Sequence, residues 1–356
     1  MISVTQEQIA SALGISRSAV KAVFNPDPRI RLGTETRQRI LTTAKRMGYV
    51  PHHAGRRLAR SRSNNRASFD QVGLIHLTRS DAKDIFVDPV CLAMMQGAEY
   101  ELSKLHASLT FMRVTEPDDW TKIERLARAD GVDGWLVYGA LDDAIARRLR
   151  AMGLPCVILG DHRCTQPVDS VNVDNFVVGR LAVQHLASLG HRRIAFFGSD
   201  MRYAYERETL EGFRAAVKEL GLDNDERLIG KLSSWTDDHE TRLVEWLRNL
   251  APMPTAVFAS EFDFAPWMQT ILHEAQIAVP EDISVLGYET LSLATKRLNF
   301  TRIELPMTEV GRQGALLLHR IVTEAHVEST RVKIAPSLIE GWSTCPPSAR
   351  NSETTN

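Results

Sequence analysis

The sequence predicts a mixed α/β protein with an N-terminal three-helix helix-turn-helix headpiece and a larger body of two doubly wound lobes. Three observations carry this prediction. Apolar residues recur at helical spacing in the first 50 residues, around a central glycine. Basic residues gather in the same region. From Gln71 onward, short apolar segments alternate with amphipathic segments, and the alternation restarts near residue 175. A length of 356 residues suits two or three domains.

The headpiece begins with two short amphipathic helices within Val4–Asn25 that meet at Gly14. Thr5 and Ser16 can cap them, because a hydroxyl at this position accepts from a free amide of the first turn. Gly14 stands where a helix end often needs positive φ. The apolar positions that fall on the buried faces are Ile9, Leu13, Ile15, Val20 and Val23. Such a pair of helices also occurs in ordinary proteins, so spacing alone leaves DNA binding and simple packing both open.

A third helix is predicted from about Thr34 to Met47, with Ile40, Leu41, Ala44 and Met47 on the face that packs against the first two helices. Gly48–Pro51 ends it. The polar, basic stretch that follows, up to residue 66, is typical of a linker, and Gly55 lowers its helix propensity.

The body is predicted to hold parallel sheets covered on both faces, because its strands are continuous apolar runs. Two lobes would place a cleft at the carboxyl ends of their strands. The predicted strands are Val72–Leu77, Ala107–Val114, Gly134–Gly139, Cys156–Gly160, Arg193–Gly198, Ala256–Ser260 and Ser284–Tyr288. The predicted helices are Asp88–Leu105, Trp120–Ala129, Asp142–Met152, Asn175–Leu189, Glu206–Leu220, Pro266–Ala275 and Thr308–Ala325.

Charge divides the chain in the same way. Residues 1–66 hold 13 Lys and Arg against 3 Asp and Glu, whereas the remainder holds 30 against 41. A basic headpiece on an acidic body is typical of a polyanion-binding module joined to a body that does not bind polyanions. A solvated basic tail is the alternative, and the helical periodicity and caps of the segment disfavour it.

Several function classes find no support in the sequence. The four cysteines show no CxxC spacing, so neither a zinc site nor a disulfide framework is expected, and Cys156 fits a small core position. A sugar-binding transport component would need a signal segment. A dinucleotide-dependent enzyme would need a Gly-rich phosphate loop, and no GxGxxG or GxxxxGK[ST] occurs. Without a signal segment or a membrane-spanning run we expect a cytoplasmic protein. Because no phosphate loop, metal-ligand spacing or nucleophile–base set is recognisable, we also expect no metal, no cofactor and no enzymatic activity.

Six longer motifs follow one another along the chain: TETRQRILTTAKRMGYVP (34–51), DGVDGWLV (130–137), GLPCVILGD (153–161), SVNVDNFVVGRLAVQHLASLGHRRIAFFG (170–198), LEGFRAAV (210–217) and VPEDISVLGYE (279–289). Through these motifs the chain resembles the lactose-repressor (LacI/GalR) family of bacterial transcription regulators, from Val4 to about Ser343. The resemblance implies a body like a periplasmic binding protein, with a small effector in the cleft. It also implies a homodimer, with a tetramer as the alternative, whose headpieces bind a roughly palindromic operator in double-stranded DNA.

The resemblance places the DNA contacts on the second helix and its flanks. Arg17 and Ser18 stand where the family reads base edges, and Arg suits guanine. Ser16 and Asn25 stand at phosphate-contacting positions. The chain departs from the family at Ala19, Lys21 and Ala22, where Thr, Ser and Arg are usual, so its operator should differ. The full set of predicted DNA-binding residues is Thr5, Ser16, Arg17, Ser18, Lys21, Ala22, Asn25, Arg56 and Leu58.

PHHAGRRL (51–58) matches the family's hinge helix, usually P-N-x-x-A-R-x-L. Leu58 takes the place of the leucine wedged into the minor groove, which is a known way to kink DNA. Gly55 replaces an alanine, so folding this segment on DNA should cost up to about 1 kcal/mol more.

The effector site predicted from the resemblance comprises Asp161, Arg207, Phe262 and Glu289. Arg207 could hold a carboxylate, or it could be a surface arginine in a salt bridge. Phe262 replaces an Asp that usually binds a sugar, which favours a sugar derivative with an anionic group. The alternative is that Asp263 shifts inward and restores an ordinary sugar site.

The expected organisation is therefore a headpiece over 1–50, a hinge segment over 51–66, a two-lobe effector-binding and dimerisation domain over 67–345, and a disordered tail over 346–356.

Overall fold

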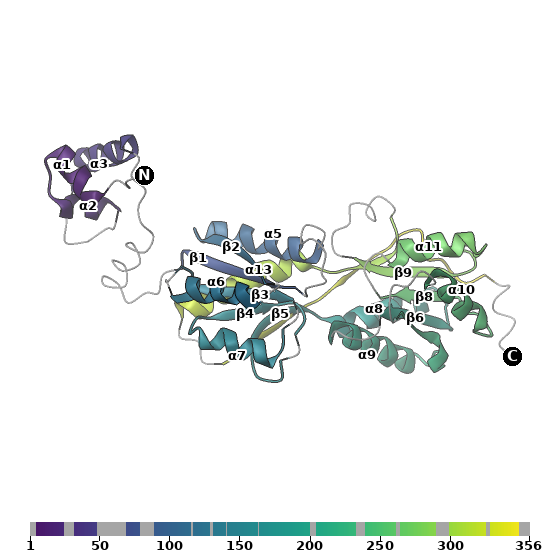
Figure 1. Cartoon of the computed structure of the whole chain (residues 1–356). Helices are drawn as coiled ribbons and strands as arrows, with labels where there is room; N and C mark the ends of the chain where they lie inside the picture. The colour runs from purple at the N-terminus through teal and green to yellow at the C-terminus, as the bar shows by residue number, and fades with distance from the viewer. Residues whose placement is uncertain are drawn as a thin grey trace.

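The computed structural model describes residues 5–24, 32–47, 69–78, 89–114, 117–128, 131–139, 141–162, 164–199, 204–232, 239–260, 264–289, 299–324 and 328–348. Figure 1 shows the chain. The predicted hinge, 51–66, lies outside the described residues. So does the predicted tail from residue 349 onward, whereas residues 346–348 are described.

The headpiece contains the three predicted helices. They are α1 (Gln6–Leu13), α2 (Arg17–Phe24) and α3 (Thr34–Arg46). Their apolar faces meet in a small core of their own. Its buried members are Ile9, Ala10, Val20, Val23, Ile40 and Ala44.

The first lobe, called lobe 1 below, is a six-stranded parallel sheet in the order β11-β5-β4-β3-β1-β2. Its strands are β1 (Gln71–Leu77), β2 (Ser108–Val114), β3 (Gly134–Gly139), β4 (Cys156–Leu159), β5 (Asp169–Val173) and β11 (Arg331–Ile334). Its helices are α5 (Pro89–Lys104), α6 (Pro117–Arg128), α7 (Asp143–Ala151) and α13 (Met307–Thr323). Residues 72–77 of β1 are all buried, because helices cover both faces of this sheet.

The second lobe, lobe 2, is a six-stranded sheet in the order β12-β10-β9-β8-β6-β7, in which β12 alone is antiparallel. Its strands are β6 (Ile194–Ser199), β7 (Ile229–Leu232), β8 (Ala256–Ala259), β9 (Ser284–Glu289), β10 (Arg302–Glu304) and β12 (Ser337–Ile339). Its helices are α8 (Asn175–Ser188), α9 (Ala204–Glu219), the short 3-10 helix η2 (Glu226–Leu228), α10 (His239–Asn249) and α11 (Phe264–Glu274).

The alternation in the sequence predicts that the two lobes are two successive halves of the chain, and this prediction is wrong. Helix α13 and strand β11 return to lobe 1, where β11 pairs with β5 and α13 packs on α5 (Figure 1). Glycines allow this close packing. A Cβ at Gly97 would lie 1.8 Å from the Thr308 carbonyl oxygen, and one at Gly311 would lie 2.0 Å from that of Met94.

The layers of the two lobes share one hydrophobic core. The cluster that includes Met94 of α5 and Val310 of α13 continues into Val178 of α8 and Phe213 of α9. Separate clusters lie beneath α6 and α7 in lobe 1 and beneath α10 and α11 in lobe 2. All four cysteines are free thiols. Burial raises the pKa of the Cys156 thiol to about 12.

Candidate functional site

Helices α1 and α2 have the caps that the sequence predicts. The Thr5 hydroxyl accepts from the Gln8 backbone N–H, and the Gln8 side chain accepts from the Thr5 N–H in return. Gly14 ends α1 with a φ of 63°. The Ser16 hydroxyl accepts from the Ala19 N–H at 3.2 Å. These caps fix where α2 begins, and therefore which side chains it exposes.

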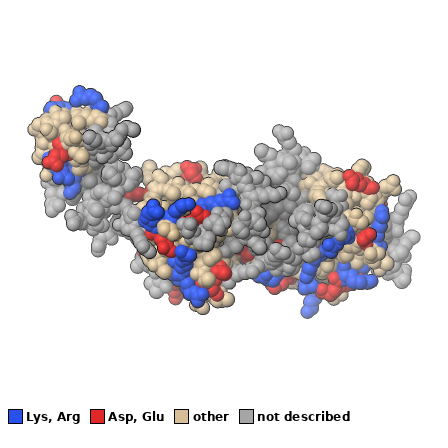
Figure 2. All heavy atoms as spheres, in the orientation of Figure 1, with Lys and Arg blue, Asp and Glu red and all other residues tan. Residues whose placement is uncertain are grey.

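Helix α2 presents one buried and one exposed face. Val20 and Val23 enter the headpiece core. The exposed face carries Ser16, Arg17, Ser18 and Lys21. The Arg17 guanidinium lies 3.7 Å from the Glu7 carboxylate, but both side chains are largely exposed. Such an exposed pair is weak and leaves Arg17 available to another anion. Figure 2 shows basic side chains at the edge of the headpiece where α2 lies in Figure 1, and others along α3.

The remaining predicted DNA-contacting residues are engaged in capping, are buried, or lie outside the described residues. Thr5 is exposed, and its hydroxyl is engaged in capping α1. Ala22 is only 7% exposed, so the headpiece itself covers most of its methyl group. Asn25, Arg56 and Leu58 lie outside the described residues.

In the body, Asp161 joins the two lobes. It follows β4 of lobe 1, and its carboxylate oxygen Oδ2 accepts from the backbone N–H of Ala204, the first residue of α9 in lobe 2, at 2.8 Å. A carboxylate at this place satisfies a free amide and interacts favourably with the helix dipole. Burial nevertheless dominates and raises the pKa of Asp161, with Glu208 adding to the rise and the bond from Ala204 opposing it.

A second contact between the lobes was not predicted from the sequence. Lys333 of β11, in lobe 1, places its ammonium 3.3 Å from the Glu208 carboxylate of α9 and 3.7 Å from that of Asp174. Asp174 in turn caps α8 by accepting from the Val177 N–H. The α8 and α9 N-terminal turns therefore both interact with charged side chains beside lobe 1.

The remaining predicted effector residues are less completely placed. Arg207 is exposed on the first turns of α9, while its neighbour Glu206 is 3% exposed. Glu289 ends β9, at the carboxyl edge of the lobe 2 sheet, but its side chain lies outside the described part of the chain. Phe262 lies outside it entirely. The structure thus brings Asp161 to the start of α9, the helix that carries Arg207, and leaves the other two contacts as predictions.

Two buried polar groups near this junction also escaped the sequence analysis. The Asn175 amide nitrogen and the Thr209 hydroxyl have no hydrogen-bond partner within the described residues. They lie on α8 and α9, which pack tightly where a Cβ at Gly179 would come within 2.0 Å of the Thr209 carbonyl oxygen. Ordinary sequence patterns give no signal for such sites, because Asn and Thr are usually exposed.

Within the described residues, no group of His, Cys, Asp and Glu could hold a metal ion. Within the same residues, no helix has the length and apolar character required to cross a bilayer.

Comparison with known proteins gives similarity over nearly the whole chain. The family described as a periplasmic binding protein-like domain matches residues 183–344. The transcriptional regulator CelR of Thermobifida fusca is 27% identical over 339 residues, covering 94% of this chain and 96% of its own. The ribose operon repressor of Escherichia coli K12 is 27% identical and covers 94% and 98%. These similarities place the chain among transcriptional regulators rather than enzymes.

Solved structures agree on the fold. The structure of the CelR–cellobiose complex is 26% identical, with a TM-score of 0.66, and covers 96% of this chain and 99% of its own. The lac repressor dimer bound to operator and the anti-inducer ONPF has a TM-score of 0.78 at 19% identity, covering 97% and 100%.

Proposed function

Since this chain belongs to the LacI/GalR family of DNA-binding transcriptional regulators, we propose that it is a repressor that binds a roughly palindromic operator as a homodimer. A small effector bound between the lobes controls its affinity for DNA. The single observation that carries this proposal is the exposed face of α2, where Arg17 and Lys21 stand beside two serines on a capped helix. A helix of this kind can enter a major groove and place its N-terminal side chains against base edges.

Dimer formation would supply the second headpiece that a palindromic operator requires. Two large side chains on α5, Leu92 and Tyr100, are 38% and 52% exposed and lie about two turns apart on lobe 1. A second copy of the chain could cover them. Sedimentation at micromolar concentration should give twice the mass of one chain, whereas a tetramer would give four times the mass of one chain.

The effector in this proposal is a sugar or a sugar-derived acid at the lobe junction, near Asp161 and α9. Asp161 and the Lys333–Glu208 pair already connect the lobes there, so a ligand that adds or replaces such contacts would change how the lobes meet. The relatives support a sugar. CelR is known in complex with cellobiose, and another relative is the repressor of a ribose operon.

The direct test is selection of genomic DNA fragments on the purified protein, followed by sequencing and a gel-shift titration of the recovered site. We expect a short site with dyad symmetry that is bound at least about 1,000-fold more tightly than unrelated DNA. Equal affinity for all fragments would contradict the proposal. The genes beside the recovered site should indicate the effector, whose addition should change the gel-shift midpoint.

A further inference from the structure

Lobe 2 contains a pocket of about 280 Å³ between its edge strand β7 and helix α10. The pocket lies on the face of the sheet that α10 and α11 cover, whereas Asp161 meets α9, which packs with α8 in another cluster. It is therefore separate from the proposed effector site. The residues that line it are Phe197, Lys231, Arg242, Leu243, Glu245, Trp246 and Asn249.

An aromatic wall with a fixed position forms one side. The Trp246 ring packs over Gly230, where a Cβ would lie 2.7 Å from the indole and 2.8 Å from the Phe197 ring. Phe197 and Trp246 have ring centroids 5.4 Å apart. The indole Nε1 donates to the Arg227 carbonyl oxygen at 3.1 Å, which fixes the orientation of the ring. The wall can therefore receive a flat ligand without first rearranging.

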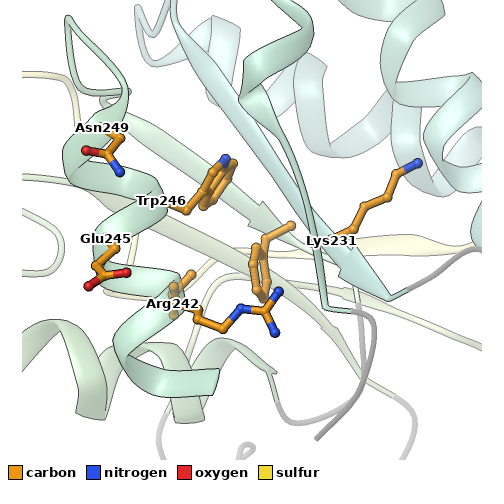
Figure 3. Close-up of a pocket in the computed structure, with 7 residues that line it drawn as sticks. Lys231, Arg242, Glu245, Trp246 and Asn249 are labelled. Carbon is orange, nitrogen blue, oxygen red and sulfur yellow. The ribbon is translucent and has the colours of Figure 1, made fainter. Parts of the chain in front are cut away.

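The rim is positively charged. Arg242 and Lys231 are exposed, and neither has a hydrogen-bond or ion-pair partner among the residues that the structure describes. In Figure 3 the Arg242 guanidinium extends toward β7, the strand that carries Lys231, while the Lys231 ammonium points away from Arg242. Glu245 lies on the far side of Trp246 from β7 in this view. An anion beside Trp246 would thus meet Arg242 first.

We propose that this pocket binds a small aromatic carboxylate, with its ring against Trp246 and its carboxylate on the guanidinium of Arg242. A guanidinium binds a carboxylate through two parallel hydrogen bonds, and its planar fork suits this geometry better than an ammonium does. Lys231 contributes attraction at longer range. The neighbouring strand argues for a small ligand rather than an added peptide strand, because β7 is only four residues long and exposes a lysine.

Calorimetric titration of the full chain with 2-naphthoate tests the proposal, with 2-naphthamide as the neutral probe of the same shape. We expect 2-naphthoate to bind with one site per chain and 2-naphthamide to bind at least about tenfold more weakly. Arg242→Gln should weaken 2-naphthoate binding by about tenfold or more, and Lys231→Gln by less than about threefold.

Arg248→Gln is the matched control, because Arg248 lies on the same helix but donates to the Ala275 carbonyl oxygen. It should leave binding unchanged. Trp246→Leu should weaken binding, and Trp246→Phe should restore part of it by returning an aromatic face. The proposal is overturned by no binding up to about 1 mM, by equal binding of the two probes, or by full binding to Arg242→Gln. None of these results depends on operator binding, which the gel-shift titration measures separately.

Discussion

The Asp161 carboxylate of lobe 1 caps helix α9 of lobe 2 by accepting from the Ala204 backbone N–H at 2.8 Å. A side chain that follows β4 thus completes the first turn of a helix in the other lobe. Its two effects on stability oppose each other, since the cap stabilises the helix while burial penalises the charge. The junction between the lobes is therefore sensitive to the charge of one residue.

We predict that Asp161→Asn raises the thermal unfolding midpoint at pH 7, because Asn can accept from the Ala204 N–H without a buried charge. The pKa of Asp161 is raised in the folded state. The penalty of the ionised form is thus present at neutral pH and disappears as the pH falls through the folded pKa. The difference in unfolding midpoint between the wild-type protein and Asp161→Asn should therefore shrink as the pH falls.

Asp161→Ala, which removes the cap, should instead lower the free energy of unfolding by about 0.5–2 kcal/mol. It should also increase hydrogen exchange in the first turn of α9. Lys122→Ala on α6 is a control far from α9 in the fold. Equal unfolding midpoints for the wild-type, Asn and Ala proteins at pH 7 would contradict a role of Asp161 in the stability of the junction.

His191 predicts a second pH dependence. Its ring is 1% exposed and lies within 2.9 Å of the Thr255 hydroxyl and of the Cys345 carbonyl oxygen. Burial lowers the pKa of His191 to about 4. The unfolded chain therefore takes up this proton first, and stability that is complete above about pH 6.5 is lost as the pH falls toward 4. The loss should reach up to about 3 kcal/mol.

Urea unfolding of wild-type protein and His191→Gln across this pH range measures the effect. The variant should be less stable at pH 7 but should lack this part of the pH dependence. If both proteins lose stability in parallel between pH 6.5 and 4, another group causes the loss.

His191 also shows what sequence patterns can and cannot supply. The motif GH-x-x-I (190–194) is recognisable as a string, but its reason is spatial, because the ring connects the start of β6 to Ser284 and to the C-terminal segment. Local signals predicted the three headpiece helices and their caps, since caps and apolar spacing act within a few residues. They were wrong about Leu41, which was expected on the packed face of α3 and is 41% exposed. They also predicted most of the buried strands of both lobes, but not β5 or β10.

Long-range pairing escaped the same approach. Strands β10, β11 and β12 have three or four residues each, which is too short for a periodic signal, and β5, β7 and α10 were also not predicted. Nothing local indicates that β11 joins lobe 1 and so brings Lys333 to Glu208. Contacts of this kind arise only from the crossing of the chain between lobes.

In the headpiece, Arg17 and Lys21 should have different effects on DNA binding. Arg17→Ala should cost about 1–3 kcal/mol on the selected operator and relax discrimination at one base pair. Lys21→Ala, as loss of a phosphate contact, should weaken all sequences similarly and flatten the salt dependence. Gel shifts at several salt concentrations measure both, with Arg125→Ala on α6 as the control. Unchanged affinity and sequence preference in Arg17→Ala would contradict the placement of α2 in the major groove.

For the predicted hinge, which lies outside the described residues, Leu58→Ser should reduce operator bending and specific affinity while non-specific binding remains. Gly55→Ala should tighten specific binding, because it favours the helix by up to about 1 kcal/mol. Circularly permuted operator fragments report the bend, and competition with unrelated DNA reports the non-specific term. Tighter operator binding by Leu58→Ser would contradict the wedge assignment.

The last prediction concerns the class of effector. The sequence resemblance aligns Phe262 with a position where sugar-responsive members of the family usually have Asp, and a phenyl ring cannot accept hydroxyl hydrogen bonds. A neutral hexose should therefore leave a hydroxyl unpaired and lose about 1–3 kcal/mol. An acidic sugar derivative should bind better, with its carboxylate on Arg207 and Glu289 on the opposite side. Arg207 is exposed on α9, the helix that Asp161 caps.

Calorimetric titration of the full chain with glucose and with glucuronate compares the two classes. Glucuronate should bind more tightly, and Arg207→Gln should remove that preference, whereas Arg214→Gln, on the same helix, should not. The competing arrangement places Asp263 in the site and restores ordinary sugar binding. Micromolar affinity for glucose that is lost in Asp263→Ala but kept in Phe262→Ala would establish that arrangement and exclude ours, because only a carboxylate at 263 could then accept the sugar hydroxyls.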